Sequence, residues 1–362
     1  MSLGEHLATT TLSLVDVASE SRHEGPVLDL LAERLASAPG LRLEDAGDAV
    51  RWFAPAGRRR DVPMVVLAGH ADTVPVGGAV FPGRREGHAV IGRGAADMKG
   101  GLAVLVALAE AGASSAAFDV GYLVIGREEL PIVDSALLPL LDRSPSVREA
   151  SLAIVLEPTA NALEVGCNGN LTAHVWIEGV AAHSARPWLG DNAITTALEV
   201  LGPLTRRPPR NVELEGLVFR EVVSVTRIEG GTADNVVPDR VSATVNLRYA
   251  PDRSPAEAEA DLRSALGDDR RVHLEIVGNA PPGPVVLANP FVERLRAAGE
   301  LAVAPKQAWT PVAEFATVGV DAVNFGPGDP RYAHHDEERV EIGALVRAYE
   351  VLRAFLAGAG RT

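Results

Sequence analysis

The sequence predicts an α/β protein whose mixed, mostly parallel sheet is interrupted by a smaller inserted α+β domain. The first observation is a series of short apolar runs at residues 63–69, 120–126 and 152–156, which indicate buried strands. The second is a helix-forming segment at residues 99–112, between the first two runs. Strands that alternate with helices are typical of a parallel sheet covered by helices. The third is a change after about residue 168, where apolar and polar residues begin to alternate as in half-buried strands.

Residues 169–280 are expected to form the inserted domain. Their segments follow the order strand, helix, strand, strand, helix, strand, which is typical of a ferredoxin-like unit. The second of these helices begins with a capping box at residues 254–257. A stretch rich in proline and glycine, residues 280–284, then returns the chain, so residues 1–168 and 281–362 are expected to form the main domain together.

Composition limits the possible functions. Hydrophobic residues make up 47% of the 362 residues, which is enough for a sizeable core. The formal net charge of -14 argues against nucleic acid as a partner, and the one basic run, residues 58–60, is interpreted as a solvated loop. A single cysteine, Cys167, excludes a disulfide framework and a cysteine-based metal site. Without a signal-like N-terminus or a long apolar segment, we expect a cytoplasmic protein that does not contact membranes.

Polar side chains with metal-binding chemistry follow the predicted strands. In an open α/β sheet, ligands bind at the carboxyl ends of the strands. Each residue alone has an ordinary explanation as a turn former or a solvated side chain, but their recurrence at successive strand ends favours one shared site. The candidates are His70, Asp72, Asp97, Glu128, Glu129, Glu157, His334 and His335.

These residue types indicate a particular class of metal site. Imidazole and carboxylate ligands without thiolate suit Zn²⁺, Co²⁺ or Mn²⁺. One aspartate that bridges two ions, with a histidine and an acid for each ion, describes a co-catalytic two-metal centre. His70 and Asp72 lie two residues apart on an extended segment, so both side chains point to the same side and Asp72 can orient the imidazole.

Eight motifs occur in order over nearly the whole chain: GHADTVP (69–75), GRGAADMKGG (92–101), REE (127–129), LEPT (156–159), AHSARPWLGDNAI (182–194), GGTADNVVPD (230–239), NLRYAP (246–251) and FGPGDP with AHHDEE (325–338). In these motifs the chain resembles the zinc-dependent family that contains succinyl-diaminopimelate desuccinylase, acetylornithine deacetylase, aminoacylase and glutamate carboxypeptidase. The resemblance implies amide hydrolysis with two divalent metal ions, most often Zn²⁺, for which Co²⁺ can substitute.

The resemblance also implies roles for individual residues. Asp97 would bridge the two ions. His70 and Glu157 would complete one metal site, and Glu129 with a histidine near the C-terminus would complete the other. Glu128 would be the general base that takes a proton from water and passes it to the leaving amine.

Two adjacent histidines, His334 and His335, compete for the last ligand position. Members of the family place an acid four residues after the ligand histidine. Counting back four residues from Glu338 gives His334, whereas His335 is followed at that spacing by Arg339. We therefore predict that His334 is the ligand and that His335 is not.

Residues outside the metal cluster are assigned by the same resemblance. His183 would act in trans, reaching the partner's site in a homodimer formed through the inserted domain and stabilising the tetrahedral oxyanion. NLRY is also compatible with purely structural strand sequence, so the binding role of its arginine stays open. The candidate substrate-binding residues are Arg186, Asn235, Arg248, Gly326 and Gly328.

The motifs SARPW and FGPGDP look most like the desuccinylase branch, which cleaves N-succinyl-LL-2,6-diaminopimelate to succinate and diaminopimelate. A small anionic N-acyl amino acid of this kind requires cationic anchors, which the candidate arginines can supply. The alternatives are another N-acyl-amino-acid deacylase of the acetylornithine type or a metallodipeptidase or carboxypeptidase. A non-catalytic binding homologue would be expected to have lost a ligand or the base, and this chain retains all of them.

Overall fold

The computed structural model describes residues 1–112 and 117–358, which fall into two compact units. The first consists of Met1–Gly166, Pro284–Lys306 and the chain from Thr310 onward. The second consists of Cys167–Gly283 together with Gln307–Trp309. The main chain therefore leaves the first unit twice, since the short segment 307–309, which we expected in the main domain, groups with the second unit.

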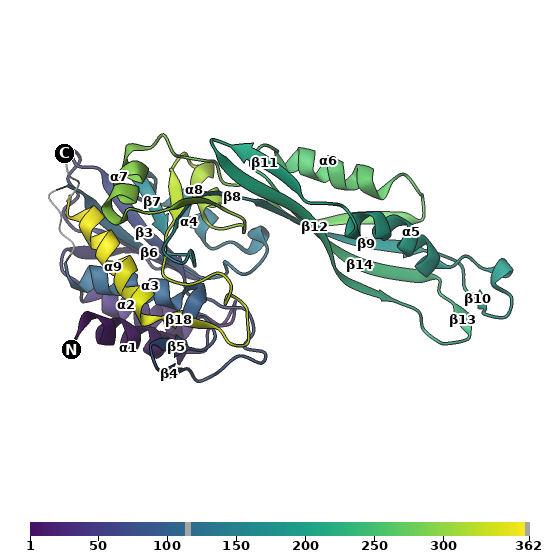
Figure 1. The fold of residues 1–362 in the computed structure, drawn as a ribbon, viewed down its shortest axis with the longest axis horizontal. Coiled ribbons are helices and arrows are strands. Elements are labelled where there is room, and N and C mark those ends of the chain that lie inside the picture. The colour runs from purple at the N-terminus through teal and green to yellow at the C-terminus, as the bar shows by residue number, and fades with distance from the viewer. Residues whose placement is uncertain (113–116, 359–362) are drawn as a thin grey trace. The chain divides into compact units, whose positions relative to one another are not determined.

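The first unit is built on an eight-stranded sheet (Figure 1). Its four neighbouring strands β6, β3, β7 and β17 run parallel, so their carboxyl ends lie at one edge. Every residue of β3 and β6 is buried, as expected for parallel strands covered on both faces. The full order is β1 (Leu41–Asp45), β2 (Val50–Pro55), β6 (Asp119–Ile125), β3 (Met64–His70), β7 (Ala150–Val155), β17 (Ala322–Asn324), β8 (Leu163–Cys167) and β16 (Val303–Lys306).

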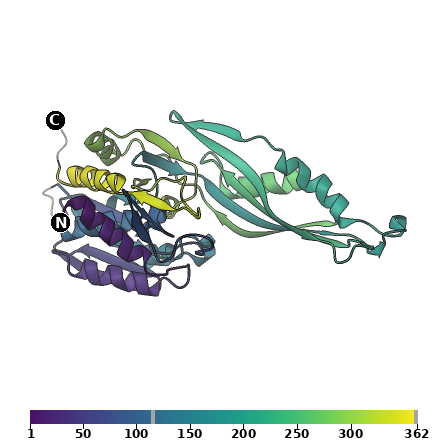
Figure 2. The ribbon, with the colours of Figure 1, turned by 60° about the horizontal axis from the view of Figure 1, so that its bottom comes forward.

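Helices surround this sheet (Figures 1 and 2). Helices α1, α3 and α9 contact one another, and α2 contacts α3 and β2. Helix α8 contacts β7, β17 and α4, while α7 contacts β7 and α9. Their bounds are α1 (Leu3–Val15), α2 (Gly25–Ala36), α3 (Gly100–Glu110), α4 (Leu137–Arg143), α7 (Pro290–Gly299), α8 (Val312–Thr317) and α9 (Ile342–Leu356).

A small three-stranded sheet in the first unit joins two loops that are far apart in sequence. Strand β18 (Arg339–Glu341) pairs with β5 (Ala89–Ile91), which also pairs with β4 (Arg84–Glu86). The chain before β18 and the chain after β5 are thereby held side by side. A short turn, Ala95–Lys99, follows β5 and leads into α3, and Asp97 and Met98 within it have non-helical backbone angles.

The second unit has an antiparallel sheet of order β11-β12-β14-β9-β15 with α5 and α6 packed on one face. Alternate residues of β9 and β14 are buried against these helices, forming the core of the unit. Helix α6 begins with the predicted capping box of Ser254 and Glu257. The elements are β9 (Gly169–Glu178), β10 (Ala182–His183), α5 (Ala193–Thr205), β11 (Arg210–Leu214), β12 (Leu217–Gly230), β13 (Val236–Val237), β14 (Arg240–Tyr249), α6 (Pro255–Leu266) and β15 (Val272–Ala280).

The predicted fold class is confirmed, with α5, α6 and four strands in the predicted βαββαβ order and β11 added at the sheet edge. The prediction that residues 58–60 form a solvated loop is wrong in one respect, because two of the three arginines are ion-paired. Arg58 and Arg59 are ion-paired with the buried carboxylate of Asp119, at 2.8 Å each, and so fix the start of β6. Among the described residues, no helix has both the length and the apolar character needed to cross a lipid bilayer.

Candidate metal centre

Parallel strand ends bring the candidate ligands together. His70 is the last residue of β3 and lies in register with Ile125, the last residue of β6. The chain beyond β6 carries Glu128 and Glu129, and the chain beyond β7 carries Glu157. Since these three strands are neighbours and run in the same direction, their following residues meet at one edge of the sheet.

The first group of converging atoms comes from His70, Asp97 and Glu157. The Nε2 atom of His70 lies 3.0 Å from Oδ1 of Asp97 and 3.7 Å from Oε1 of Glu157. The side chain of His70 is buried, and Oε1 of Glu157 is buried without a hydrogen-bond partner. A buried carboxylate oxygen without a partner is costly and indicates that another group completes its surroundings.

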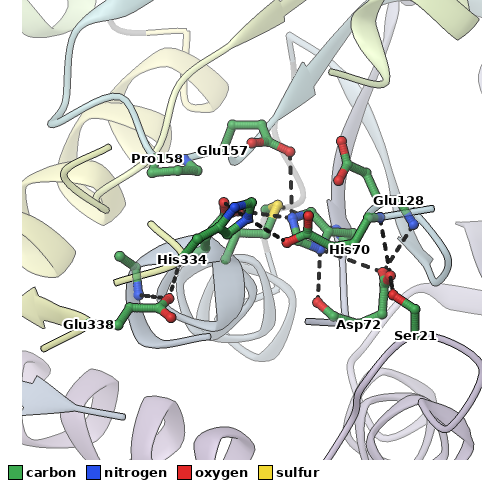
Figure 3. Close-up of polar contacts among 12 residues, drawn as sticks. Ser21, His70, Asp72, Glu128, Glu157, Pro158, His334 and Glu338 are labelled. Carbon is green, nitrogen blue, oxygen red and sulfur yellow. Dashed lines mark hydrogen bonds and ion pairs between the residues drawn. The ribbon is translucent and has the colours of Figure 1, made fainter. Parts of the chain in front are cut away.

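The second group comes from Asp97, Glu129 and His334, of which His334 is labelled in Figure 3. The Nε2 atom of His334 lies 2.9 Å from Oε1 of Glu129 and 3.5 Å from Oδ2 of Asp97. Asp97 therefore presents Oδ1 to His70 and Oδ2 to His334. One carboxylate with its two oxygens aimed at two ligand groups is the arrangement expected of a bridging ligand.

The distances in both groups fit a pair of divalent ions. Two ligands that each lie about 2.0–2.1 Å from a tetrahedral zinc ion are about 3.4 Å apart. The separations of 2.9, 3.0, 3.5 and 3.7 Å bracket that value. The donor set of imidazole and carboxylate without thiolate fits Zn²⁺, Co²⁺ or Mn²⁺.

The rings of the two adjacent histidines, His334 and His335, have different partners in the structure. His334 adopts a left-handed backbone conformation with φ of 61° and turns its ring toward Glu129 and Asp97. The ring of His335 instead accepts a hydrogen bond at Nδ1 from the backbone N–H of Glu337, at 3.1 Å. Only His334 is thus brought to the ligand cluster among the two candidates.

Asp72 is placed differently from our expectation. The Nδ1 atom of His70 lies 3.0 Å from the main-chain carbonyl oxygen of Asp72, whereas the nearest carboxylate oxygen of Asp72 is at 3.6 Å. That carboxylate accepts hydrogen bonds from the backbone N–H groups of Glu128 and Glu129, at 3.1 and 3.3 Å, and from the hydroxyl of Ser21, at 2.7 Å. Asp72 therefore orients the imidazole through its backbone and holds the Glu128–Glu129 turn through its side chain.

Glu128 lies beside the ligands without a hydrogen bond that would fix its charge. Its carboxylate belongs to a group with His70 and Glu129 whose ligand atoms all lie within 4.8 Å of one another. Burial raises the pKa of Glu128 well above its usual value, although His70 opposes this effect, and the charges of Glu157 and Glu129 raise it further. A carboxylate whose pKa is raised in this way is a stronger proton acceptor than a solvated glutamate.

The remaining pKa shifts follow from the crowding of acids. Burial and the charge of Asp97 raise the pKa of Glu157 to about 7. Burial alone would lower the pKa of His70, but its acidic neighbours Asp72 and Asp97 raise it well above the usual value. Burial opposes ionisation of Asp97, but the hydrogen bond to His70 and the nearby charges of His70, His334 and Lys306 together hold the pKa of Asp97 below the usual value.

The sequence did not predict two residues that support the site. Lys306, at the end of β16, is buried, donates to the carbonyl of Pro158 at 2.8 Å and pairs with Glu164 at 3.0 Å. Glu338, used above only as a spacing marker, is buried and accepts backbone hydrogen bonds beside Asp97. Lys306 lies outside the motifs, and the position of Glu338 at the end of AHHDEE did not reveal its partners.

The candidates in the second unit form a separate group. His183 in β10 pairs with Val236 in β13, and the backbone N–H of Ser184 donates to the carbonyl of Asn235. The backbone N–H of Arg186 donates to the carbonyl of His183, so His183, Arg186 and Asn235 are close neighbours. Arg248 lies elsewhere, on β14, where its Nε donates to Asn246 at 3.0 Å.

Gly326 and Gly328 lie where no side chain would fit. A Cβ atom on Gly326 would be 2.4 Å from the carbonyl oxygen of Leu156, and one on Gly328 would be 2.2 Å from that of Ala96. Their own carbonyl oxygens accept hydrogen bonds from the turn after Glu157. The two glycines thus allow the chain after β17 to pack closely against the segments that carry Glu157 and Asp97.

The fold and the cluster of candidate ligands are together typical of metallohydrolases whose site lies at the edge of an α/β sheet. Residues 165–273 match the model of the peptidase dimerisation domain of the M20 family. A Mycobacterium tuberculosis protein that carries a provisional succinyl-diaminopimelate desuccinylase name is 40% identical over 96% of this chain and 97% of its own length. The Corynebacterium glutamicum succinyl-diaminopimelate desuccinylase is 32% identical, over 98% of this chain and 96% of its own.

The same fold occurs in a solved structure, the M20 family metallo-carboxypeptidase of Sulfolobus solfataricus. It superposes with a TM-score of 0.77 over 99% of both chains at 18% sequence identity. The chain belongs to the M20 metallopeptidase family, and it is a metal-dependent hydrolase of amide bonds.

The raised pKa values predict how pH affects the metal-free protein. A carboxyl group with a higher pKa in the folded chain binds more protons when folded, so stability falls as the pH rises. For Glu157 this loss runs from its ordinary value of 4.5 to about 7, and the raised pKa of His70 continues it at higher pH. We expect the Tm of metal-free protein to fall between about pH 5 and pH 8.

Thermal denaturation with and without Zn²⁺ measures this effect. Stabilisation by Zn²⁺ should grow with pH because the ligands must lose their protons to bind it. The variant Glu157→Gln should show a shallower fall than the parent. A Tm of the metal-free parent that is flat or rises over this range would contradict the prediction.

The separation of the two histidines predicts different metal contents for two neighbouring variants. His334→Ala removes a member of the second ligand group, so each chain should retain one ion fewer than the parent. His335→Ala, which changes a residue outside the cluster, is the matched control and should retain the parent's metal content. Elemental analysis after dialysis measures the metal content of each variant. Equal metal content in both variants would contradict the assignment of His334 as the ligand.

Proposed function

We propose that this chain hydrolyses N-succinyl-LL-2,6-diaminopimelate to succinate and LL-2,6-diaminopimelate. The observation that carries the proposal is the pair of ligand groups that share Asp97, with Glu128 beside them. The substrate is supported by the names of two relatives that align with nearly the whole chain.

The described residues suit the binding of two divalent ions, for which we favour Zn²⁺. His70 and Glu157 would hold one ion, Glu129 and His334 the other, and Asp97 both. When bound, such ions polarise the amide carbonyl and make water acidic enough to act as a nucleophile near neutral pH.

Glu128 is assigned the proton transfers. Its carboxylate lies with the ligands His70 and Glu129, and Asp72 fixes its backbone through the hydrogen bond at 3.1 Å. It accepts a proton from the attacking water and donates it to the departing nitrogen, so that the amine leaves in neutral form. A pKa raised by burial suits both transfers, since the group must gain and lose the same proton in one cycle.

His183 is assigned to the oxyanion and acts in the active site of a partner subunit. Its Nδ1 accepts a hydrogen bond from the backbone N–H of Ala185, at 3.0 Å, so in the neutral ring Nε2 carries the proton. The exposed ring therefore offers a donor of the kind that stabilises an oxyanion. Asn235, its neighbour, would support the same substrate oxygen.

A homodimer would supply that partner subunit. Of the eleven large apolar side chains that are exposed on the described residues, seven lie in the matched dimerisation domain. Ile194 and Leu198 lie one turn apart on α5 and are 38% and 67% exposed. Trp188 and Leu189, just before this helix, are 74% and 65% exposed. Grouped exposed apolar side chains are typical of protein interfaces, and we assign these to the dimer contact.

Arg186 and Arg248 are candidate anchors for the carboxylates of the substrate. Similarity to a metallo-carboxypeptidase favours a second candidate function, in which the chain cleaves a peptide or another N-acyl amino acid.

A substrate panel tests the proposed reaction. The zinc-loaded and cobalt-loaded protein is assayed with N-succinyl-LL-2,6-diaminopimelate, N-acetylornithine and dipeptides, and we expect the succinylated substrate to have the highest kcat/KM. In the same assay Glu128→Gln should lose about 10²–10⁴-fold in kcat while keeping its metal, because it removes only proton transfer. Rapid acetylornithine hydrolysis without desuccinylation would refute the substrate assignment, and an active Glu128→Gln would refute the base.

Mixing two inactive variants tests whether His183 acts in trans. His183→Ala lacks the oxyanion donor and Glu128→Gln lacks the base, but a mixed dimer contains one site with both residues intact. Re-equilibrated equal mixtures should recover about a quarter of the parental activity, since half the dimers are mixed and half their sites are complete. Introducing Leu198→Glu into both variants should abolish the recovery by separating the subunits. No recovery from dimers that demonstrably exchange would show that His183 acts within its own chain.

A further inference from the structure

The carboxylate of Glu338 is buried and fully engaged, although it is not among the candidate ligands. Its Oε1 accepts hydrogen bonds from the backbone N–H groups of Ala96 and Asp97, at 3.2 and 3.0 Å (Figure 3). Its Oε2 accepts from Nη1 of Arg93 at 2.6 Å, and both side chains of this pair are almost completely buried. Glu338 thus accepts a hydrogen bond from the backbone of Asp97, the residue whose side chain belongs to both ligand groups.

The same pair also fixes the loop that carries His334. The backbone N–H of Glu338 donates to the carbonyl of His335, and Nη1 of Arg93 approaches that carbonyl at 3.4 Å. The carbonyl of Glu338 accepts from the backbone N–H of Gly92, at 2.9 Å, just before the segment of Asp97. The pairing of β18 with β5 continues this contact. Two loops more than two hundred residues apart in sequence are therefore joined at Glu338.

We propose that Glu338 and Arg93 are positioning residues that hold Asp97 and His334 in register with each other, and thereby set the affinity of the ion shared by Asp97, Glu129 and His334. This inference rests on the metal centre proposed above but not on the identity of the substrate. His70 is the last residue of β3 and Glu157 lies two residues beyond the end of β7, so their positions depend much less on the pair of Glu338 and Arg93. The effect of disrupting the pair should therefore be unequal at the two ions.

A carboxylate is required because its two oxygens perform different tasks. In Glu338→Gln the amide oxygen can serve either the backbone N–H groups or Arg93, but the amide nitrogen, itself a donor, must then face the other donor. Breaking one partner of a buried ion pair also leaves the remaining charge unpaired. The adjacent Glu337 is exposed in the same loop, and Glu337→Gln removes the same charge while leaving these hydrogen bonds intact.

Zn²⁺ titrations against a competing chelator, with Co²⁺ absorption spectra, test the inference. Glu338→Gln should weaken the ion that His334→Ala abolishes by about 10–100-fold and shift its Co²⁺ absorption, as replacement of groups that orient metal ligands usually does. The other ion should be affected less, and Glu337→Gln should match the parent at both ions. Affinities in Glu338→Gln within about twofold of the parent at both ions would overturn the proposal.

Amide hydrogen exchange of the metal-free proteins gives a second measurement that requires no metal. Exchange at Ala96 and Asp97 should be faster in Glu338→Gln than in the parent or Glu337→Gln, with most other segments unchanged. Unchanged exchange there would overturn the proposal even if the metal were bound more weakly. A parent that binds two ions without desuccinylating activity refutes the proposed substrate, while these titrations still decide the role of Glu338.

Discussion

The shared carboxylate of Asp97 is the interaction on which the rest of the site depends. Its two oxygens face two histidines that are far apart in sequence, His70 at the end of β3 and His334 after β17. A bridging carboxylate tolerates little displacement, because a shift that brings one oxygen closer to its ion moves the other oxygen away from the second ion. The supporting structure can therefore be understood as a set of constraints on the backbone around Asp97 and on the two imidazoles.

The negative charge of the clustered carboxylates explains why the site favours the binding of cations. Four carboxylates, those of Asp97, Glu128, Glu129 and Glu157, converge at one edge of the sheet, and burial makes their simultaneous ionisation costly. Lys306 supplies one nearby positive charge, which is itself engaged by Glu164. Divalent ions would offset the remaining repulsion and give Oε1 of Glu157 the partner that it lacks.

Much of the fold was predictable because its signals are local. Continuous apolar runs identify buried parallel strands, and the capping box at Ser254 identifies the start of α6. The first 62 residues gave no such prediction, yet they form two helices and a hairpin whose identity depends on packing against α3 and β6. The candidate ligands were predictable because the strand-end rule and family motifs both concern single residues. Their convergence is visible only in the structure, and their roles remain proposals.

Two acids whose structural roles sequence reasoning did not predict both have backbone N–H groups among their partners. Asp72 and Glu338 are carboxylates beside a metal-type cluster, and by composition either could be a ligand. Each instead binds two consecutive N–H groups, Asp72 those of the Glu128–Glu129 turn and Glu338 those at Ala96 and Asp97. Backbone donors have no sequence signature, so only tertiary structure distinguishes an acid that binds an ion from one that holds the ligand loop. The candidate ligands and the acids that bind the loop backbones are thus different residues, and only the structure separates the two kinds.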